Sequence, residues 1–589
     1  MFSRGSKQLL LERGSIARSL PRSARTHYQR YSSNAGPSQP KRTIVPRWIL
    51  PYAAVGGVTA VGSFVYLYLK DIKSVPAPKE PPPVEVVVEE KILSRDRSKE
   101  ENKEALSPQH LQVKKSWENP GVYAWGSNLG GVANPDSKET TVKTPQRIPY
   151  FDGMLLRDLK LDRNFGAAIS EHGDLIQWGK GYSRTSHVPS KTLVGKNLVS
   201  ICILRDRVVA LSSGGDVYSL PVSKTDQESG TKPYETSWIP FWKNRASLSY
   251  RRLRPQLGLG EKVTAISGGL EHVLLLTSSG RVYSAACGAE HYPSRGQLGI
   301  PGLKWSTRPA GPYDICHEVS ALHGLRVTDI AAGDYHSLAR DKQGRVFVFG
   351  DNSSGQLGLP TDPSSSFLDT PTIIPLQKLY SGKGYDAKTT SIAAGGANSF
   401  FMVDAKRILG KEETATAVRD LGRVTKEVWS CGNGLYGNLG SGRWTHIQDA
   451  PTKVRALSGL MEFDDKTQKV VPIGVSNISV GSTHASAVLG NKTNVGASAK
   501  SSQTDTNYGS DVLFWGGNEF FQLGTGKRNN VPAPQYISPP SDVEISEPQR
   551  QEHRWEVTPR RTVKLGGRKV SFEQRVECGR FVTAVYSAV

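Results

Sequence analysis

Three histidines are the side chains in this sequence whose recurrence first suggests chemistry. His272, His336 and His484 each follow a glycine by three residues in a repeated pattern. Imidazole groups that converge on one point can bind a metal ion. Residues at one repeat position lie in different structural units, however, and a hydrogen bond to a neighbouring turn explains their recurrence. We therefore interpret these histidines as structural and expect no metal site.

The five cysteines and the glycine clusters give no sign of a catalytic or cofactor site. The cysteines lie far apart and form no Cys-x-x-Cys pair, which argues against a zinc site or a dense disulfide scaffold. Gly214-Gly215 and Gly268-Gly269 lack the following helix and lysine of a phosphate-binding loop. No metalloprotease or nucleophile-elbow motif is present. We expect a protein that is not an enzyme and has no cofactor, although a site assembled across repeats stays open.

An inserted loop holds the residues that we consider candidates for binding a partner. It adds some thirty residues between Pro221 and the sequence Gln256-Leu257-Gly258-Leu259-Gly260, which we interpret as the Gln-Leu-Gly tag of that repeat. Tryptophan and arginine dominate the hot spots of protein interfaces. The alternative is a flap that packs on the domain with its arginine stems. The candidate residues are Trp238, Phe241, Trp242, Arg245, Arg251, Arg252 and Arg254.

The elements that must position these residues are strands of a repeat running from Val122 to Val589. Seven segments alternate apolar and small residues and end in Trp-Gly or a relative, as expected of sheet strands. They begin at Val122, Leu175, Val217, Val282, Val346, Val428 and Val512. Their predicted partner strands are 166–170, 208–212, 272–277, 336–341, 399–404, 484–489 and 581–586.

The two ends of this array predict its closure. The segment at Val122 has no partner strand before it, and the strand at Phe581 has no such segment after it. Both ends therefore belong to one blade, and the ring has no open sheet edge. The predicted fold is all-β, a seven-bladed β-propeller closed by pairing of the N- and C-terminal strands and preceded by a single transmembrane helix.

The first 31 residues have the composition of a mitochondrial presequence. They contain seven Arg or Lys, one acidic residue, Glu12, and interspersed leucines, which suits a helix with a cationic and an apolar face. A disordered basic tail is the alternative. Arg30-Tyr31 resembles a processing site, with cleavage after Tyr31.

Residues 48–69 carry no charge and are long enough to cross a membrane as one helix. Aromatic residues stand at both ends, as in interface anchors. A buried element of a soluble domain is the alternative. The Pro-rich, charged residues 70–116 are predicted to be an extended linker, and 117–589 form the propeller.

The formal net charge is +21, and +15 remains without residues 1–31. This charge suits RNA, anionic lipid or an acidic protein.

The repeats resemble those of the regulator of chromosome condensation family. The matching sequences are Trp125-Gly126-Ser127-Asn128, Gly350 to Gly358 with Gln356-Leu357-Gly358, and Trp515 to Gly524 with Gln522-Leu523-Gly524. The resemblance covers about 117–589 and implies a seven-bladed propeller. The second and third repeats depart from the pattern, with Gly181 in place of the usual Asn and Leu220-Pro221 in place of Trp-Gly.

The whole layout is similar to that of fungal inner-membrane members of this family linked to the assembly of respiratory complex III. The resemblance implies a non-enzymatic assembly factor that binds complex III subunits or assembly factors. Nucleotide exchange on a mitochondrial small GTPase and assembly of the mitochondrial ribosome on RNA are the alternatives. We expect a single-pass inner-membrane protein. A presequence followed by a stop-transfer helix favours a propeller in the intermembrane space, but Lys70 and Lys73 weaken this charge argument and the side stays open.

Overall fold

The computed structural model describes residues 108–236, 243–361, 364–410, 413, 420–464, 467–495, 506–540 and 553–589. All of them belong to one compact unit, Leu93–Val589. The predicted presequence, the membrane span at 48–69 and the linker up to residue 107 lie outside the described residues. Within these ranges, no helix has both the length and the apolar character that a membrane crossing requires.

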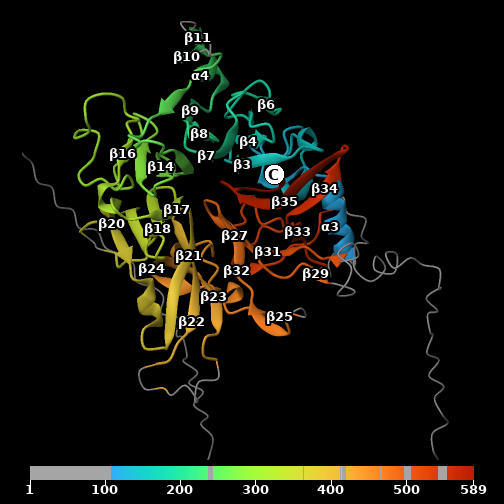
Figure 1. Ribbon diagram of the computed structural model, residues 1–589. Helices are drawn as coiled ribbons and strands as arrows, with labels where there is room; N and C mark the ends of the chain where they lie inside the picture. Colours follow the sequence, from blue (N-terminus) through green and yellow to red (C-terminus); the bar gives the residue numbers. More distant parts are fainter. Residues whose placement is uncertain are drawn as a thin grey trace, which may run out of the picture. The chain divides into compact units, whose positions relative to one another are not determined.

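The described residues form a β-propeller, in which antiparallel sheets are arranged in a ring (Figure 1). Four sheets have four strands, in the orders β7-β8-β9-β12, β13-β14-β15-β16, β17-β18-β19-β20 and β21-β22-β23-β24. A fifth has the path β27-β28-β31-β32 with β33 added at β31, and the nine-stranded sheet contains β1–β6 and β34–β36. Glycines at the turns allow the sharp reversals that this many short strands need.

The strand bounds of the four-stranded sheets are as follows. They are β7 Leu198–Ile203, β8 Arg207–Ser212, β9 Val217–Pro221, β12 Arg251–Leu253; β13 Val263–Gly268, β14 His272–Thr277, β15 Val282–Ala286, β16 His317–Glu318; β17 Val327–Ala332, β18 His336–Asp341, β19 Val346–Asp351, β20 Phe367–Ile374; β21 Tyr385–Gly395, β22 Asn398–Arg407, β23 Val424–Gly434 and β24 Thr445–Lys453.

The bounds in the two larger sheets follow. They are β27 Val475–Val480, β28 His484–Leu489, β31 Ser510–Gly516, β32 Val531–Gln535, β33 Glu556–Val557; β1 Val122–Ser127, β2 Thr141–Arg147, β3 Leu156–Leu161, β4 Gly166–Ser170, β5 Leu175–Trp178, β6 Ser190–Lys191, β34 Arg561–Leu565, β35 Arg568–Cys578 and β36 Val582–Ala588.

Short hairpins and helices lie outside these sheets. The hairpins pair β10 Tyr234–Thr236 with β11 Lys243–Arg245, β25 Met461–Asp464 with β26 Lys469–Pro472, and β29 Asn494–Val495 with β30 Thr506–Asn507. The α-helices are α3 Pro108–Glu118 and α4 Lys224–Ser229, and the 3-10 turns are η1 Pro149–Phe151, η2 Ser320–Leu322, η3 Leu376–Tyr380 and η4 Arg455–Leu457.

The predicted closure is confirmed by the strand pairing. β1 pairs antiparallel with β36 from Val122↔Tyr586 to Gly126↔Val582. β36 also pairs with β35, so the first strand of the repeat and the last two strands of the chain share one sheet. A single parallel pair, Leu156↔Ala588, connects this group to β3.

The predicted repeat strands are also confirmed, with ends that agree within a few residues. The core lies between neighbouring sheets, where the tryptophans that end the third strands are fully buried. Trp125 Nε1 donates to Gln522 O at 2.9 Å and Trp515 Nε1 donates to Asn438 O at 2.9 Å, each in the preceding sheet. The Trp-Gly and Gln-Leu-Gly signatures therefore recur because each supplies one half of a contact between sheets.

The predicted linker ends earlier than residue 116, because residues 108–116 belong to the helix α3. Val113 and Trp117 of this helix pack on Leu155 and Phe572. The Gln112 side chain donates to Glu556 O at 2.8 Å and accepts from Glu556 N at 3.2 Å. The packing of Val113 and Trp117 supplies apolar burial that the composition of the linker did not indicate.

The tag predicted at Gln256-Leu257-Gly258 is a second correction. In other repeats the tag glutamine and leucine are buried, as are Gln356 and Leu357. Here Leu257 is 38% exposed and Leu259 fully exposed, because the sequence follows the fourth strand β12 rather than preceding it. The insertion with α4 occupies the place of the tag.

Candidate partner-binding surface

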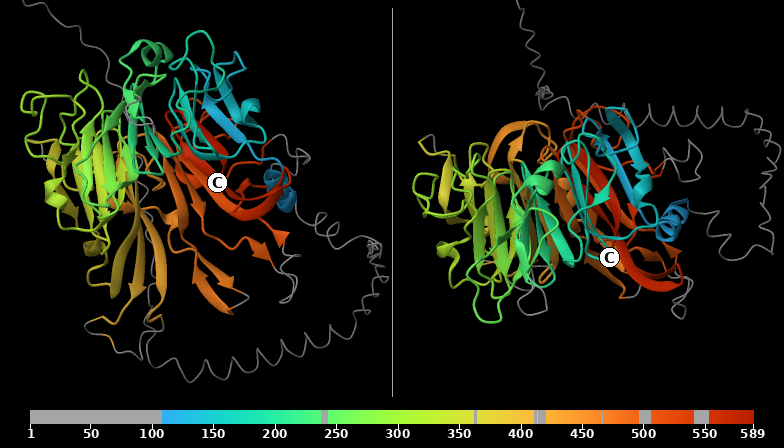
Figure 2. Two further views of the ribbon diagram at one scale, coloured as in Figure 1. Left: turned by 45° about the horizontal axis from the view of Figure 1, so that its top comes forward. Right: turned by 90° about the horizontal axis from the view of Figure 1, so that it is seen from above.

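The insertion projects from the rim of the ring as a small helix followed by a hairpin (Figures 1 and 2). Ser223 caps α4, since its side chain accepts from Asp226 N. The hairpin β10–β11 is held to the propeller by Glu235, which binds Lys196 Nζ at 2.7 Å and accepts from the Tyr250 hydroxyl at 2.6 Å. Burial would raise the pKa of Glu235, but these two donors hold it below its usual value. The hairpin is thus an anchored projection.

The four predicted partner-binding arginines that the structure describes have different surroundings. Arg245 lies on the hairpin, with its guanidinium 5.7 Å from the ring of Tyr234, which is 66% exposed. Arg251 forms a bidentate ion pair with Asp314, with Nε–Oδ2 at 2.5 Å and Nη2–Oδ1 at 2.6 Å. This ion pair holds Arg251 against the next sheet.

The neighbouring arginines have other surroundings. Arg252 lies over the Tyr218 ring of its own sheet at 5.4 Å, and Arg254 is exposed beyond the end of β12. Trp238, Phe241 and Trp242 lie outside the described residues. Among the candidates that the structure describes, Arg245 is the one on the projecting hairpin, beside the exposed Tyr234.

The three repeated histidines form hydrogen-bond relays between sheets. His272 Nε2, His336 Nε2 and His484 Nε2 lie 2.7 to 2.9 Å from a hydroxyl of the next sheet, and each hydroxyl donates to a tag carbonyl. Because the hydroxyl proton is used on the carbonyl, Nε2 must carry the imidazole proton. The hydroxyls belong to Ser337, Ser399 and Thr583, and the carbonyls to Gln297, Gln356 and Gln522.

Burial keeps these histidines neutral. It lowers the pKa of His272 and His484 to about 3 and that of His336 to about 4. The prediction of a structural role agrees with these contacts, although the partner is a hydroxyl on a strand instead of a turn. Among the residues that the structure describes, no group of three or more His, Cys, Asp or Glu side chains could hold a metal ion.

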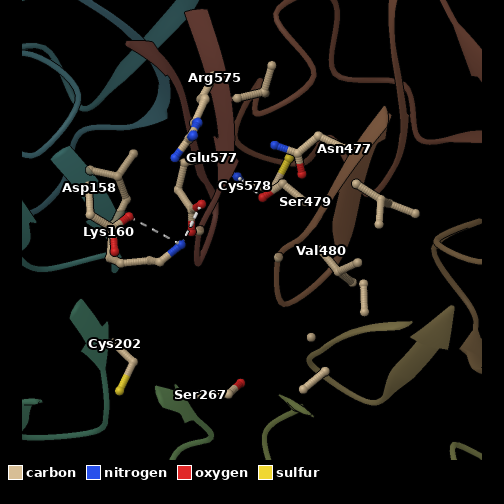
Figure 3. A pocket seen from close by; sticks show the side chains of 18 of the residues that line it. Asp158, Lys160, Cys202, Ser267, Asn477, Ser479, Val480, Arg575, Glu577 and Cys578 are labelled. Atoms are coloured by element: carbon tan, nitrogen blue, oxygen red, sulfur yellow. Dashed lines mark hydrogen bonds and ion pairs between the residues drawn. The ribbon is translucent and has the colours of Figure 1, made fainter. Parts of the chain in front are cut away.

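A central channel of about 920 Å³ runs between the inner strands (Figure 3). Strand registers place one residue of each inner strand at an equivalent position on its wall. Most of these residues are small or carry no charge, but two oppositely charged ones stand side by side. The set is Lys160, Cys202, Ser267, Ala331, Ala393, Ser479 and Glu577.

The charged members of this set neutralise each other. Lys160 Nζ lies 2.8 Å from Glu577 Oε2 and 3.9 Å from Asp158 Oδ1. Burial alone would lower the pKa of Lys160, but the two carboxylates raise it, so the ammonium stays charged. Burial raises the pKa of the Cys202 thiol to about 12, which leaves it protonated and a poor nucleophile. The described wall therefore offers structural ion pairs and no activated nucleophile.

Sequence reasoning missed this ion pair. Its signal was present, because Lys160 and Glu577 interrupt a repeat position that is otherwise small, but the position is recognisable only after the registers are known. Arg580 was missed too: it bridges Asp162 at 3.3 Å and Asp334 at 2.8 Å, and thereby ties the turn between β35 and β36 to the end of β3 and to the sheet of β17 and β18.

Comparison with protein families gives matches to one repeat type. Residues 327–356, 343–402 and 510–547 match models of the "Regulator of chromosome condensation (RCC1) repeat". Those segments contain the buried Gln-Leu-Gly tags and Trp-Gly strand ends described above.

Two mitochondrial proteins are among the similar relatives. "Protein FMP25, mitochondrial" of Saccharomyces cerevisiae is 26% identical over 456 residues, 72% of this chain and 68% of the relative. "RCC1 domain-containing protein RUG3, mitochondrial" of Arabidopsis thaliana is 26% identical over 374 residues, 62% of this chain and 71% of the relative.

Among solved structures, the crystal structure of Prp20p from Saccharomyces cerevisiae has a similar fold. It has a TM-score of 0.50 and 17% sequence identity, and the match covers 81% of this chain and 94% of Prp20p. At this identity the likeness concerns the fold alone.

Proposed function

We propose that this chain, a member of the RCC1 repeat family, is a non-enzymatic scaffold that acts in mitochondria in the assembly or stability of an inner-membrane respiratory complex. The observation that carries the proposal is the similarity to the mitochondrial yeast relative over 72% of the chain. The presequence-like residues 1–31 agree with it. A rigid ring suits the presentation of loops to other proteins.

The finer architecture belongs to the same proposal. We divide the nine-stranded sheet into two blades, β35-β36-β1-β2 and β3-β4-β5-β6, because a single residue pair connects them. With the five other large sheets this gives seven blades. Residues 48–69 would anchor the ring in the inner membrane, with the propeller in the intermembrane space.

Complex III is the specific assembly that we propose. Affinity purification of the full-length protein from mitochondria in a mild detergent should recover complex III subunits or their assembly factors. Deletion of the gene should lower the amount of assembled complex III on native gels while the other complexes stay at their usual level. An unchanged complex III in the deletion strain would contradict the proposal.

The two alternatives predict other partners in the same purification. An exchange factor should recover a small GTPase and accelerate release of labelled GDP from it. A ribosome assembly factor should recover ribosomal proteins and crosslink to ribosomal RNA, with binding that weakens steeply as salt rises. Protease treatment of mitochondria without their outer membrane tests the side, because an exposed propeller is degraded and a matrix propeller is protected.

A further inference from the structure

Two phenylalanines adopt a backbone conformation that bulky residues avoid. Phe521 and Phe581 have φ values of 65° and 63°. This left-handed region costs a residue with a Cβ roughly 1–2 kcal/mol. In a bulky residue it marks a turn under strain. The two residues belong to neighbouring turns at the seam where the ring closes.

Phe521 occupies a position that is glycine in the equivalent turns of other sheets. Its N–H donates to Asn518 O at 3.1 Å and its carbonyl accepts from Gly524 N at 3.0 Å, in the pattern of the glycine turns. The backbone therefore adopts the glycine conformation without a glycine. The equivalent residues are Gly131, Gly296, Gly355 and Gly437, with φ between 65° and 80°.

At three of these turns, those of Gly296, Gly355 and Gly437, the backbone of the next sheet leaves no room for a side chain. A Cβ on Gly355 would lie 2.6 Å from Asp449 Cα, and one on Gly437 would lie 2.6 Å from Pro532 Cα. At the seam Phe521 is accommodated, and the turn still reaches β2 through the bond from Gly526 N to Lys143 O at 3.3 Å. Glycine would satisfy the same turn without strain. The phenylalanine side chain therefore does something that glycine cannot.

The strained residues belong to a cluster that we call the phenylalanine patch: Phe520, Phe521 and Phe581 with Lys143, Arg163 and Arg528. The Phe520 and Phe581 rings lie 5.1 Å apart. Arg163 lies over both, at 5.3 and 5.8 Å. Lys143 and Arg528 lie 5.9 and 5.8 Å from the Phe521 ring.

The patch combines half-buried rings with three cations for which the described residues supply no ion pair. All three phenylalanines are half-buried, and Lys143 and Arg528 are exposed. Within the part of the chain that the structure describes, none of the three cations forms an ion pair. Rings with arginines are the composition of interface hot spots. A cation already lies over each ring, on a face that a nucleic-acid base would need for stacking.

We propose that the phenylalanine patch is a docking site for an acidic segment of a partner protein. Carboxylates of that segment pair with Lys143, Arg163 and Arg528, and its apolar side chains pack on the phenylalanine rings. The strain at Phe521 and Phe581 keeps the rings at the surface. The site lies away from the rim hairpin and does not depend on which complex the scaffold serves.

Photo-crosslinking in intact mitochondria tests the proposal. The full-length protein carries p-benzoylphenylalanine in place of Phe520, with Val194, which is 56% exposed, as the matched control position. We expect a protein adduct from position 520 whose crosslinked peptide is rich in Asp and Glu. The double variant K143E/R528E should lower its yield about tenfold or more, as for a hot spot. An adduct with RNA or lipid, no protein adduct above the Val194 control, or an undiminished yield in the double variant would each overturn the proposal.

The variant Phe521→Gly separates docking from packing. Glycine relieves the strain, so we expect an unchanged or higher melting temperature together with at least a tenfold loss of the adduct. A lower melting temperature with an undiminished adduct would show that Phe521 only packs the seam, and would overturn the proposal. If F521G lowers both, the surface variant K143E/R528E decides. A variant that loses complex III but keeps the adduct, or keeps complex III but loses the adduct, shows that the docking site and the proposed function can fail separately.

Discussion

His484 Nε2 lies 2.7 Å from Thr583 Oγ1, although the two residues are 99 positions apart. Thr583 in turn donates to Gln522 O at 2.7 Å, so one hydroxyl connects the last strand to two segments of the preceding sheet. The same relay joins His272 and His336 to their neighbours. Where the chain ends, a side-chain network reinforces the backbone pairing of β1 with β36.

Replacing Thr583 with alanine should destabilise the propeller. The substitution leaves His484 Nε2 buried without its partner, which costs about 1–3 kcal/mol, whereas Gln522 O keeps the hydrogen bond from Trp125 Nε1. Chemical denaturation measures the change in the free energy of unfolding. Thr583→Ser is the matched control, since it keeps the hydroxyl and should recover most of the loss; an alanine variant as stable as the serine variant would show that the relay contributes nothing.

Removal of residues 578–589 should abolish cooperative folding. This truncation deletes β36, the central strand between β1 and β35, and exposes the edges of both. Thermal unfolding followed by circular dichroism is the measurement. A truncated protein with an unchanged melting curve would contradict the closure.

The stability of the propeller should fall as pH drops from 6.5 to 5. The pKa of the three relay histidines is lowered by burial to about 3 to 4, so the unfolded chain binds protons below about pH 6.5 that the folded chain does not. Burial raises the pKa of Glu556 to about 7, and this group acts in the opposite direction. For these four groups alone, unfolding takes up about two protons net, which corresponds to about 3 kcal/mol per pH unit.

Urea titrations at pH 7.5, 6 and 5 measure this slope. His484→Gln should reduce the number of protons taken up on unfolding by about one, and the slope with it. A slope that does not change in this variant would mean that His484 is not buried in its neutral form.

Lys160→Met should destabilise the wall of the channel. It leaves Glu577, whose side chain is 15% exposed, without its ammonium partner. Because the Lys160 side chain keeps 30% of its surface exposed, the cost is smaller than for a fully buried pair, about 1–3 kcal/mol. Adding Glu577→Gln removes the orphaned charge and should restore part of the stability. Denaturation of the single and double variants gives both values, and a double variant no more stable than Lys160→Met would show that the pair is not coupled.

Removing the rim hairpin should leave the fold intact and weaken binding of partners. Residues 234–245 can be replaced by a short Gly-Ser turn, since Ala246 N already donates to Pro233 O at 2.9 Å across its base. The matched control replaces the hairpin β25–β26 in the same way. We expect both variants to melt like the parent, and only the first to lose complex III subunits on affinity purification. Equal recovery of complex III subunits with both variants would show that the rim hairpin is not part of the binding surface.

The repeat made most of the propeller predictable. Glycine turns, strand alternation and the Trp-Gly ends report contacts that every sheet must make with the next, so strand positions such as His336–Asp341 could be predicted to the residue. Prediction failed where a motif was present without its context. Gln256-Leu257-Gly258 resembles a tag but follows the fourth strand, and its leucine faces solvent.

The candidate site was less predictable for a physical reason. Arg251 and Arg252 are adjacent on β12, and alternation along a strand sends their side chains to different surroundings. The phenylalanine patch could have been suspected, because Phe521 stands where other repeats carry glycine. Phe581 and Arg163, however, lie about 60 and 360 residues away from Phe520 in the sequence, and their approach to it is visible only in the folded ring.

The pairing of β1 with β36 also sets the timing of folding. A chain that emerges from a ribosome or a membrane pore with its N-terminus first presents Val122 early, yet the strand that covers it ends at Ala588. Until β36 has emerged, β1 keeps an unpaired edge and β35 lacks one of its two neighbours. Closure therefore follows the formation of the other sheets, and any chaperone that shields the open ring must stay bound until β36 is available to pair.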